Sequence, residues 1–327
     1  MSLDADTIVD RRRMRRKLTF WRVTAIAIAI LAIVGSGVLL APRTDIFKTA
    51  GASGYIARIR IEGLIRDNQE RVEALDRLAK SSAQAVIVHL DSPGGTTAGS
   101  QELFESLRAV QAKKPMVVVV DGLAASGAYI AAMSADHIVA RDTSLVGSIG
   151  VLFQFPNFTE ALKTIGIKVE AIKSSPLKAA PNGFEPTSPE ARAAIDSLVE
   201  DSYAWFKGLV KNRRHMSDDE LARVSDGRVF TGRQAIGLKL IDALGNEKTA
   251  LAWLQSAKKV PANTPVRDYS LNSRFGDLTF LHVAAWMFEA MGLKSLAHRV
   301  ETWSAVQSVE RLNLDGLLAL WHPSVSN

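Results

Sequence analysis

The domain starts at Tyr55, and residues 57–62 alternate between apolar and charged side chains, with the apolar ones on one side of the pattern. A period of two predicts a β-strand with one buried and one solvated face. The runs 85–90 and 116–120 are predominantly apolar instead, which predicts strands covered on both faces. Residues 138–140 form a shorter apolar run of the same kind.

Apolar residues recur at helical spacing between these strands, over residues 72–79, 103–110 and 127–135. The order of elements is therefore strand, helix, strand, helix, strand. This alternation predicts an α/β fold with a largely parallel sheet covered by helices. Successive strand-to-helix loops then emerge at the same edge of the sheet.

The chain beyond these elements carries signals of helix ends. Residues 188–189 have the Ser-Pro of a helix start, residues 217–220 and 231–234 are capping boxes, and Gly245 suits a helix C-terminus. Later the pattern loosens, and we expect residues 263–327 to form an apolar, aromatic helical tail that contacts a partner subunit or the membrane surface. Ordinary core packing is the alternative for this tail.

Residues 23–41 contain no charged side chain and would span about 28 Å as a helix, enough to cross a hydrocarbon core. The alternatives are a buried helix and a cleaved signal peptide, but Pro42 directly follows the small residue where cleavage would occur. We therefore interpret residues 23–41 as an uncleaved transmembrane anchor. The arginine-rich arm, residues 1–22, then stays in the cytoplasm. This predicts a single-pass protein of a bacterial inner membrane in which everything after Pro42 lies on the periplasmic side.

Composition narrows the possible functions. A chain of 327 residues, 47% of them hydrophobic, can bury a core, and we expect a globular domain over residues 55–262 after a linker, residues 42–54. The absence of cysteine excludes disulfides, thiolate catalysis and cysteine metal sites, and we expect no metal ion and no cofactor. Residues 1–22 hold seven basic and three acidic groups, a net +4 of the chain's +6. The remainder therefore lacks the basic surface of a nucleic-acid-binding protein.

The segment 122–129, Gly-Leu-Ala-Ala-Ser-Gly-Ala-Tyr, follows the buried strand at 116–120 and leads into a helix. Small neighbours leave the hydroxyl of Ser126 unshielded, and Gly127 frees the next backbone N–H to face a carbonyl that the hydroxyl attacks. Ser126 is therefore a candidate nucleophile. The alternative is that these small residues only allow a helix to pack closely on the sheet.

Two more glycine turns lie near this serine in the predicted topology. Gly94 and Gly95 would offer backbone N–H groups to an oxyanion at a helix N-terminus. A phosphate site is the competing use, although the loop lacks the glycine and lysine pattern of a P-loop or a dinucleotide fold. Ser148, in the turn 147–150, is a second exposed serine, for which bonding within the turn is the alternative.

A serine nucleophile needs a base, and histidine is the usual one. The chain's histidines are His89, His137, His215, His282, His298 and His322. None belongs to a recognisable motif with aspartate, so we expect structural roles, with His137 the most open case. A lysine can serve instead where desolvation lowers its pKa about 2–3 units from 10.4. Lys178 fits best, because it lies among prolines and small residues with no acid nearer than Glu185.

Several motifs together resemble the bacterial signal peptide peptidase A family, in its short membrane-anchored form, within the Clp-protease/crotonase-like superfamily. They occur in the family's order over about residues 55–250. The matching pieces are Asp91-Ser-Pro-Gly-Gly95, Ala124-Ala-Ser-Gly127, Gly147-Ser-Ile-Gly-Val151, Ile172-Lys-Ser-Ser-Pro-Leu-Lys178 and Ser225-Asp-Gly-Arg-Val-Phe-Thr-Gly-Arg-Gln234. Each motif alone is modest, and their order behind an N-terminal anchor makes the resemblance specific.

The resemblance implies a serine endopeptidase with a Ser/Lys dyad. Ser126 would attack the peptide carbonyl, and Lys178 would act first as the base and then as the acid. Ser148 would help to hold the lysine. The resemblance also implies a homo-oligomer, a ring or dome such as an octamer, in which the lysine can come from the neighbouring protomer. Remnant signal peptides left in the membrane after secretion would be the substrates.

The family's oxyanion hole falls on the backbone N–H groups of Gly94 and Gly127, with Gly95 a less favoured substitute for Gly94. The chain departs from the family at Ala128, where relatives often have a second glycine. Two other functions stay open: a crotonase-like acyl-CoA enzyme with a similar oxyanion hole, and a non-catalytic scaffold that holds membrane partners. The anchor argues against the first, and the presence of both dyad residues argues against the second.

Overall fold

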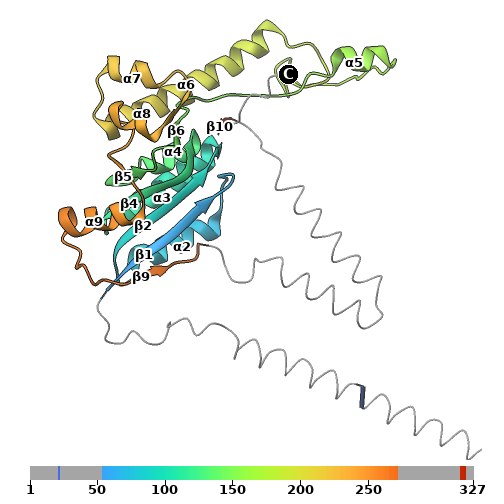
Figure 1. Cartoon of the computed structure of the whole chain (residues 1–327). Helices are drawn as coiled ribbons and strands as arrows, with labels where there is room; N and C mark the ends of the chain where they lie inside the picture. The colour runs from blue at the N-terminus through green and yellow to red at the C-terminus, as the bar shows by residue number, and fades with distance from the viewer. Residues whose placement is uncertain (1–20, 23–53, 272–316, 322–327) are drawn as a thin grey trace, which may run out of the picture. The chain divides into compact units, whose positions relative to one another are not determined.

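The computed structural model of the chain describes residues 21–22, 54–271 and 317–321 (Figure 1). Residues 1–53 and 54–327 form two separate compact units. The predicted arm, anchor and linker lie almost entirely outside the described residues. Among the residues that the structure does describe, no helix is both long and apolar enough to cross a membrane.

The second unit is built on an eight-stranded sheet whose strand pairs are parallel, except that β6 and β7 are antiparallel. The strands β7, β6, β4, β2, β1 and β9 follow one another in that order, and β5 pairs with β4 and with β8. The bounds are β1 Tyr55–Glu62, β2 Ala83–Ser92, β4 Met116–Ala125, β5 His137–Ala140, β6 Leu145–Gly147, β7 Val229–Thr231, β8 Ala243–Leu244 and β9 Val266–Asp268.

Helices cover both faces of the sheet (Figure 1). The helices of the described residues, of which α5 does not contact the sheet, are α2 Gln69–Lys80, α3 Thr97–Gln111, α4 Gly127–Ala132, α5 Thr159–Thr164, α6 Pro189–Arg214, α7 Asp218–Val224, α8 Gly232–Gly237 and α9 Glu247–Lys258. Alternate residues of β2 show the two faces: Val86 and Val88 join the larger core with α2, α3 and α4, whereas Ala85 and Ile87 join a smaller core with α9. The predicted α/β fold with a mostly parallel sheet is confirmed.

The predicted helix starts are also confirmed. Ser188 caps α6 through the backbone N–H of Ala191, and both capping boxes form, at the starts of α7 and α8. The expectation for Gly245 is wrong. It lies between β8 and α9 with φ of 147°, where the chain turns from a strand into a helix.

The predicted tail, residues 263–327, falls mostly outside the described residues. Its described parts contain strands: β9 lies parallel to β1, and β10, Leu318–Leu320, pairs antiparallel with β3, Gly94–Thr96. A helical period in the local sequence does not reveal such pairings, because each strand depends on a partner more than 200 residues earlier.

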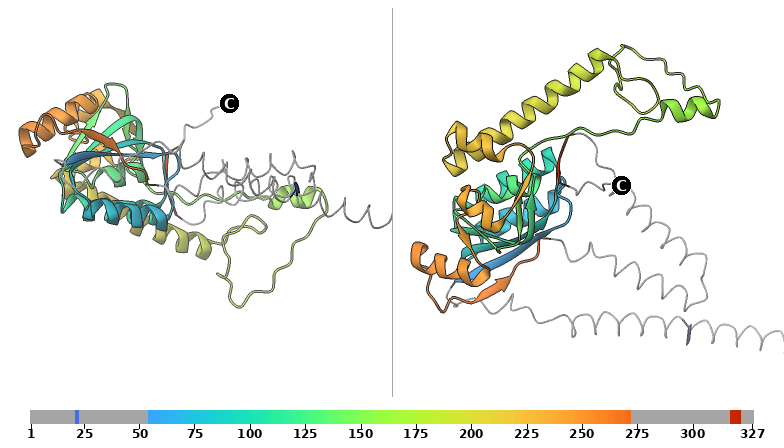
Figure 2. Two further views of the ribbon diagram at one scale, coloured as in Figure 1. Left: turned by 90° about the horizontal axis from the view of Figure 1, so that it is seen from below. Right: turned by 45° about the horizontal axis from the view of Figure 1, so that its top comes forward.

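Residues 151–188 form an extended arm that includes α5. In all views of Figures 1 and 2, the part of the arm that carries α5 lies away from the sheet, and α6 leads back to the body. Several large apolar side chains of the arm are exposed, namely Phe158, Ile165, Ile167, Val169, Ile172, Leu177 and Phe184. Exposed apolar side chains in this number usually mark a contact surface.

His89 of β2 lies between two carboxylates on the α9 side of the sheet. Its Nδ1 is 2.7 Å from Asp121 Oδ2, and its Nε2 is 2.7 Å from Glu247 Oε2. Arg58 of β1 donates from Nε to Glu247 at 2.8 Å and from a terminal nitrogen at 2.6 Å. These contacts join β1, β2, β4 and the first turn of α9, and they satisfy the expectation of a structural role for His89.

We expect Glu247→Gln to lower the free energy of unfolding at pH 7 by about 1–2 kcal/mol, since the partly exposed pair is partly screened by solvent. Burial is the largest influence on the pKa of Glu247 and raises it, but hydrogen bonds from Arg58 and His89 outweigh burial, so the pKa lies below its usual 4.5. The stabilisation is fully present above pH 4.5 and is lost as the pH falls through the lower folded-state pKa. Urea unfolding of both proteins from pH 3 to 7 measures this, and a difference independent of pH would contradict it.

Candidate active site

Ser126 lies where β4 ends and α4 begins. Its backbone has φ of 55° and ψ of −116°, a region that residues other than glycine rarely adopt. The backbone N–H of Ser126 donates to Gly147 O at 2.8 Å, and its carbonyl accepts from the N–H groups of Tyr129 and Ile130. Such a conformation costs about 1–3 kcal/mol and persists only where surrounding contacts hold it, which is typical of functional sites.

The hydroxyl of Ser126 is not used to cap the N-terminus of α4. It makes no capping bond to α4, although serine at this position usually accepts from the helix backbone. Its one hydrogen bond among the described residues is long, 3.4 Å from Oγ to Gly150 O. The residue is only 1% exposed. This is the arrangement expected for a nucleophile that is held in place by its backbone.

Gly127 has no room for a side chain. A Cβ at this position would lie 2.1 Å from Ser100 Oγ and 2.9 Å from the carbonyl oxygen of Ala319. Ser100 is fully buried in α3, and its Oγ donates to Thr96 O at 2.8 Å. The alternative that small residues only permit close packing is therefore true in part, since the same glycine both packs tightly and leaves its N–H at the start of α4.

Gly94 approaches Gly127 closely. Gly94 has φ of 101°, and a Cβ there would lie 2.7 Å from Gly127 N and 2.1 Å from Ala319 O. Its own N–H donates to Ser92 Oγ at 3.1 Å. Gly95 faces elsewhere, because a Cβ at that position would meet Ile65 O at 1.7 Å. Gly94 and Gly127 are thus together, as predicted, while Gly95 is held by packing against residue 65.

The turn that contains Ser148 lies beside the same strand end. Residues 123–125 of β4 pair with residues 145–147 of β6, which precede the turn. Ser148 has φ of 51°, is 7% exposed, and donates its N–H to Arg228 O at 2.8 Å. The expectation that Ser126 and Ser148 are exposed is therefore wrong, because the neighbouring segments bury both residues. The sheet therefore brings Ser148 and Ser126 to one end of β4.

Lys178 is placed differently. It is exposed on the arm, and its backbone N–H donates to Ser175 O at 3.1 Å. None of the ion pairs of the described residues includes Lys178; the carboxylate of Glu185 instead pairs with Lys173, which lowers the pKa of Glu185. No contact between Lys178 and Ser126 is present among the described residues. One chain thus assembles the serine, the glycines and Ser148, but leaves the lysine on the arm.

Other titratable groups near α4 have structural roles. Burial raises the pKa of the Tyr129 phenol, whose hydroxyl donates to Leu240 O at 2.7 Å. Burial also lowers the pKa of His137, whose ring stacks on Trp253 at 4.6 Å between centroids. Neither group contacts Ser126. In the part of the chain that the structure covers, no cluster of three His, Asp or Glu residues could hold a metal ion.

Sequence reasoning missed two residues that position this site, Ser92 and Ser100. Ser92 was visible only as part of the Asp91-to-Gly95 motif, and Ser100 as one polar residue inside a helical pattern. Their roles are contacts with Gly94 and Gly127, which lie up to 27 positions away in the chain. Complete burial of both hydroxyl groups is the structural signal that reveals them.

Comparison with known proteins adds an independent observation. The model of the family described as Peptidase family S49 matches residues 108–261. A candidate protease of Synechocystis sp. is 34% identical over 63% of this chain and 75% of its own length. A candidate protease of Methanocaldococcus jannaschii is 33% identical over 64% and 68%, and a candidate signal peptide peptidase of Enterococcus faecium is 27% identical over 66% and 67%. The chain belongs to peptidase family S49. It is a serine protease, and the resemblance drawn from the motifs is confirmed at the level of the family.

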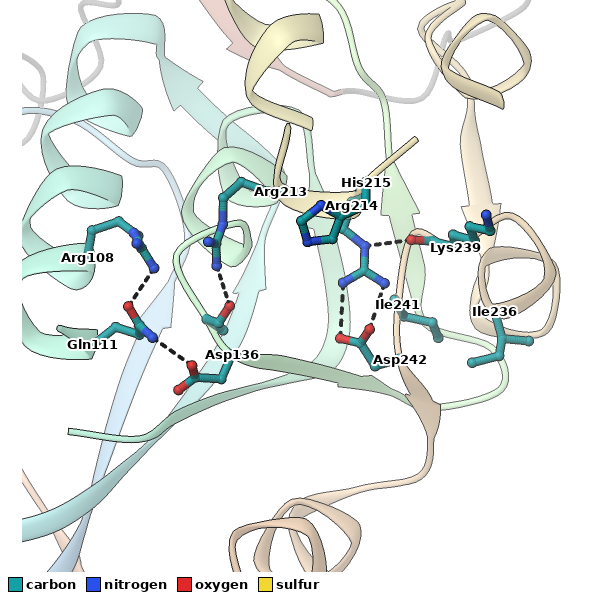
Figure 3. Close-up of a pocket in the computed structure, with 11 residues that line it drawn as sticks. Arg108, Gln111, Asp136, Arg213, Arg214, His215, Ile236, Lys239, Ile241 and Asp242 are labelled. Atoms are coloured by element: carbon teal, nitrogen blue, oxygen red, sulfur yellow. Dashed lines mark hydrogen bonds and ion pairs between the residues drawn. The ribbon is translucent and has the colours of Figure 1, made fainter. Parts of the chain in front are cut away.

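This S49 peptidase also has a polar pocket of about 650 Å³, and Ser126 is not among the residues that line it (Figure 3). Its arginines are engaged within the chain. Arg213 donates to Met133 O at 2.7 Å and to Ala135 O at 2.8 Å, and Arg214 donates to Asp242 Oδ1 at 2.8 Å. The arginines of this pocket therefore connect the C-terminus of α6 to the residues after α4. The pocket is not part of the candidate active site.

We expect Gly127→Ala in this S49 peptidase to lower the free energy of unfolding by about 1–3 kcal/mol, because the new methyl group overlaps Ser100 Oγ. Ser100→Ala alone should cost about 1 kcal/mol through the lost bond to Thr96 O. The double variant should cost less than the sum by about 0.5 kcal/mol or more, since the overlap is relieved. Urea unfolding of the four proteins measures this coupling. Additive costs would show that the hydroxyl does not set the size limit at position 127.

Proposed function

We propose that this S49 peptidase is a serine endopeptidase that uses a Ser126/Lys178 dyad built across two subunits. The observation that carries the proposal is the strained backbone of Ser126 at the end of β4. Its hydroxyl makes no capping hydrogen bond to α4. The glycines at 94 and 127 lie against each other beside it. A nucleophile next to backbone donors is the arrangement that acyl transfer requires.

The proposed reaction proceeds through an acyl-enzyme. Ser126 Oγ attacks the carbonyl carbon of the peptide while the neutral amine of Lys178 takes the hydroxyl proton. The N–H groups of Gly127 and Gly94 stabilise the oxyanion, which requires Gly94 N to exchange its present bond to Ser92 Oγ. The C–N bond then breaks, and Lys178 returns the proton to the leaving amine. The same lysine then takes a proton from water, whose oxygen attacks the acyl carbon; the bond from that carbon to Ser126 Oγ breaks, and the lysine returns the proton to Oγ.

Three features of the arm support a lysine supplied by a neighbouring subunit. Lys178 is exposed and does not contact Ser126 in its own chain. Apolar side chains near it, such as Ile172 and Leu177, are exposed as well. Glu185 is paired with Lys173, and none of the ion pairs of the described residues includes Lys178. Burial of the arm against another copy would remove water from the lysine and favour the neutral amine that a base needs. Ser148 would then hold that amine.

The proposal includes the cellular setting. Residues 23–41 would anchor the chain in a bacterial inner membrane, residues 1–22 would remain in the cytoplasm, and the protease domain, residues 55–262, would face the periplasm. The substrates would be remnant signal peptides, in keeping with the name of the Enterococcus faecium relative. Subunits in a ring or dome, such as an octamer, would supply each other's lysines.

We expect Ser126→Ala to lower peptide hydrolysis at least about 10⁴-fold, because the nucleophile is lost while the fold remains. A fluorophosphonate reagent should label the wild-type protein on Ser126 and leave the variant unlabelled, as read by peptide mapping. Ser148→Ala is the matched control, because it should keep the labelled residue. Normal turnover by Ser126→Ala, or labelling at another serine, would overturn the proposed nucleophile.

We expect Lys178→Ala to lower hydrolysis about 10²–10⁴-fold through loss of the base. Mixed oligomers of Lys178→Ala and Ser126→Ala subunits should recover part of the activity, since some sites then combine an intact serine with an intact neighbouring lysine. Lys168→Ala, another exposed lysine of the arm, should remain active on its own. Hydrolysis is measured after dissociation and reassembly of the mixture. Failure of the mixture to recover, with both parents assembled, would favour a dyad within one chain.

A further inference from the structure

The short strand β10 lies along the glycine turn of the candidate active site (Figure 1). Leu318 pairs with Thr96, Ala319 with Gly95 and Leu320 with Gly94 in an antiparallel register. Backbone hydrogen bonds extend the pairing on both sides, from Thr97 N to Leu317 O at 3.0 Å and from Trp321 N to Pro93 O at 2.8 Å. Residues 317–321 are therefore an extended peptide bound through its main chain.

The other edge of this peptide is also paired. Leu152 donates to Leu318 O at 3.0 Å, and Leu318 donates to Leu152 O at 3.0 Å. Leu152 follows two residues after Gly150, whose carbonyl oxygen is the hydrogen-bond partner of Ser126 Oγ. Residues 317–321 thus fill the space between β3 and residue 152, and pairing on both edges is the way in which a groove binds an extended peptide.

The carbonyl oxygen of Ala319 lies against both glycines of the proposed oxyanion hole. A Cβ would approach this oxygen to 2.1 Å if added at Gly94 and to 2.9 Å if added at Gly127. These residues of β10 are closed to solvent, since Ala319 is 0% and Leu318 is 9% exposed. Of the peptide groups in residues 317–321, that of Ala319 is thus the one aligned with the site.

We propose that residues 317–321 are a built-in pseudosubstrate that occupies the peptide-binding groove of the same chain and must leave before a substrate binds. The inference rests on the proposed function, because the groove beside Ser126 is the substrate site only if Ser126 is the nucleophile. It adds the binding mode: a substrate strand runs antiparallel to β3, pairs with Leu152 on its other edge, and presents a small residue where Ala319 now lies. It also adds a control step, because Ser126 is covered while β10 is in place.

In the competition for the groove, residues 317–321 are favoured over a free peptide. A tethered segment acts at a high effective concentration, so a free peptide must compete with a bound neighbour in the same chain. Release of β10 leaves the large sheet intact, because β10 pairs with β3 and residue 152 and with no strand of the eight-stranded sheet. Weakening β10 should therefore raise access to the groove without unfolding the domain.

The test uses the full chain with Leu318→Pro, compared with the wild type and with Leu318→Val. Proline removes the N–H that bonds to Leu152 O and fits poorly in a strand paired on both edges, whereas valine keeps the N–H. We expect Leu318→Pro to react with a fluorophosphonate at Ser126 about three- to tenfold faster than the wild type, as loss of one such bond would predict. Leu318→Val should react at close to the wild-type rate. Circular dichroism and urea unfolding check that the three proteins are equally folded.

A binding measurement keeps the inference separate from the proposed chemistry. A fluorescein-labelled peptide with the sequence of residues 317–321, extended by lysines for solubility, is titrated into each protein in the Ser126→Ala background. It should bind the Leu318→Pro protein more tightly than the other two, by the same three- to tenfold factor, read by fluorescence anisotropy. Equal binding by all three proteins, or equal labelling rates where Ser126 is labelled, would overturn the pseudosubstrate. Absence of labelling from every protein would count against the nucleophile alone, and the peptide titration would then decide the inference.

Discussion

The close approach of three backbone segments at one end of the sheet is the constraint on which the site depends. Gly94, Gly127 and Ala319 lie so near to one another that a single methyl group would overlap a neighbour at either glycine. Ser92 and Ser100 hold these segments from within the protein. The buried polar contacts and the missing side chains together force the strained turn at Ser126, and the turn places its hydroxyl beside backbone donors.

The sheet divides structural and chemical roles between different groups. On the α9 side, His89, Arg58 and Glu247 tie neighbouring strands to a helix through charged hydrogen bonds. At the carboxyl end of β4, the turn at Ser126 meets two glycines whose contacts leave no room for a side chain. The charged network can change without altering the glycine contacts, because the two sets of residues are joined only through the strands.

A single chain holds most, but not all, of what the proposed reaction needs. The serine, the glycines and Ser148 converge at the end of β4, while Lys178 lies on an exposed arm with apolar neighbours. The groove beside Ser126 is filled by residues 317–321. Two events would therefore precede catalysis, the arrival of another subunit's arm and the departure of the internal strand. Hydrolysis would then depend on assembly of the oligomer and on displacement of residues 317–321 by a substrate, in addition to the presence of Ser126.

Local patterns were sufficient for the α/β fold, the four longest strands, most of the helices, and the candidates Ser126, Gly127 and the pair Gly94 and Gly95, because burial periodicity, helix caps and small-residue turns act over a few residues. Family motifs were needed to favour Lys178 over the histidines. Only the tertiary structure revealed the contacts of Ser92 and Ser100, the bonds of His89, the strand role of residues 318–320 and the separation of Lys178 from Ser126. Each of these depends on segments that are far apart in the sequence but close in space. The order of residues alone does not show which distant backbones come close enough to exclude a side chain.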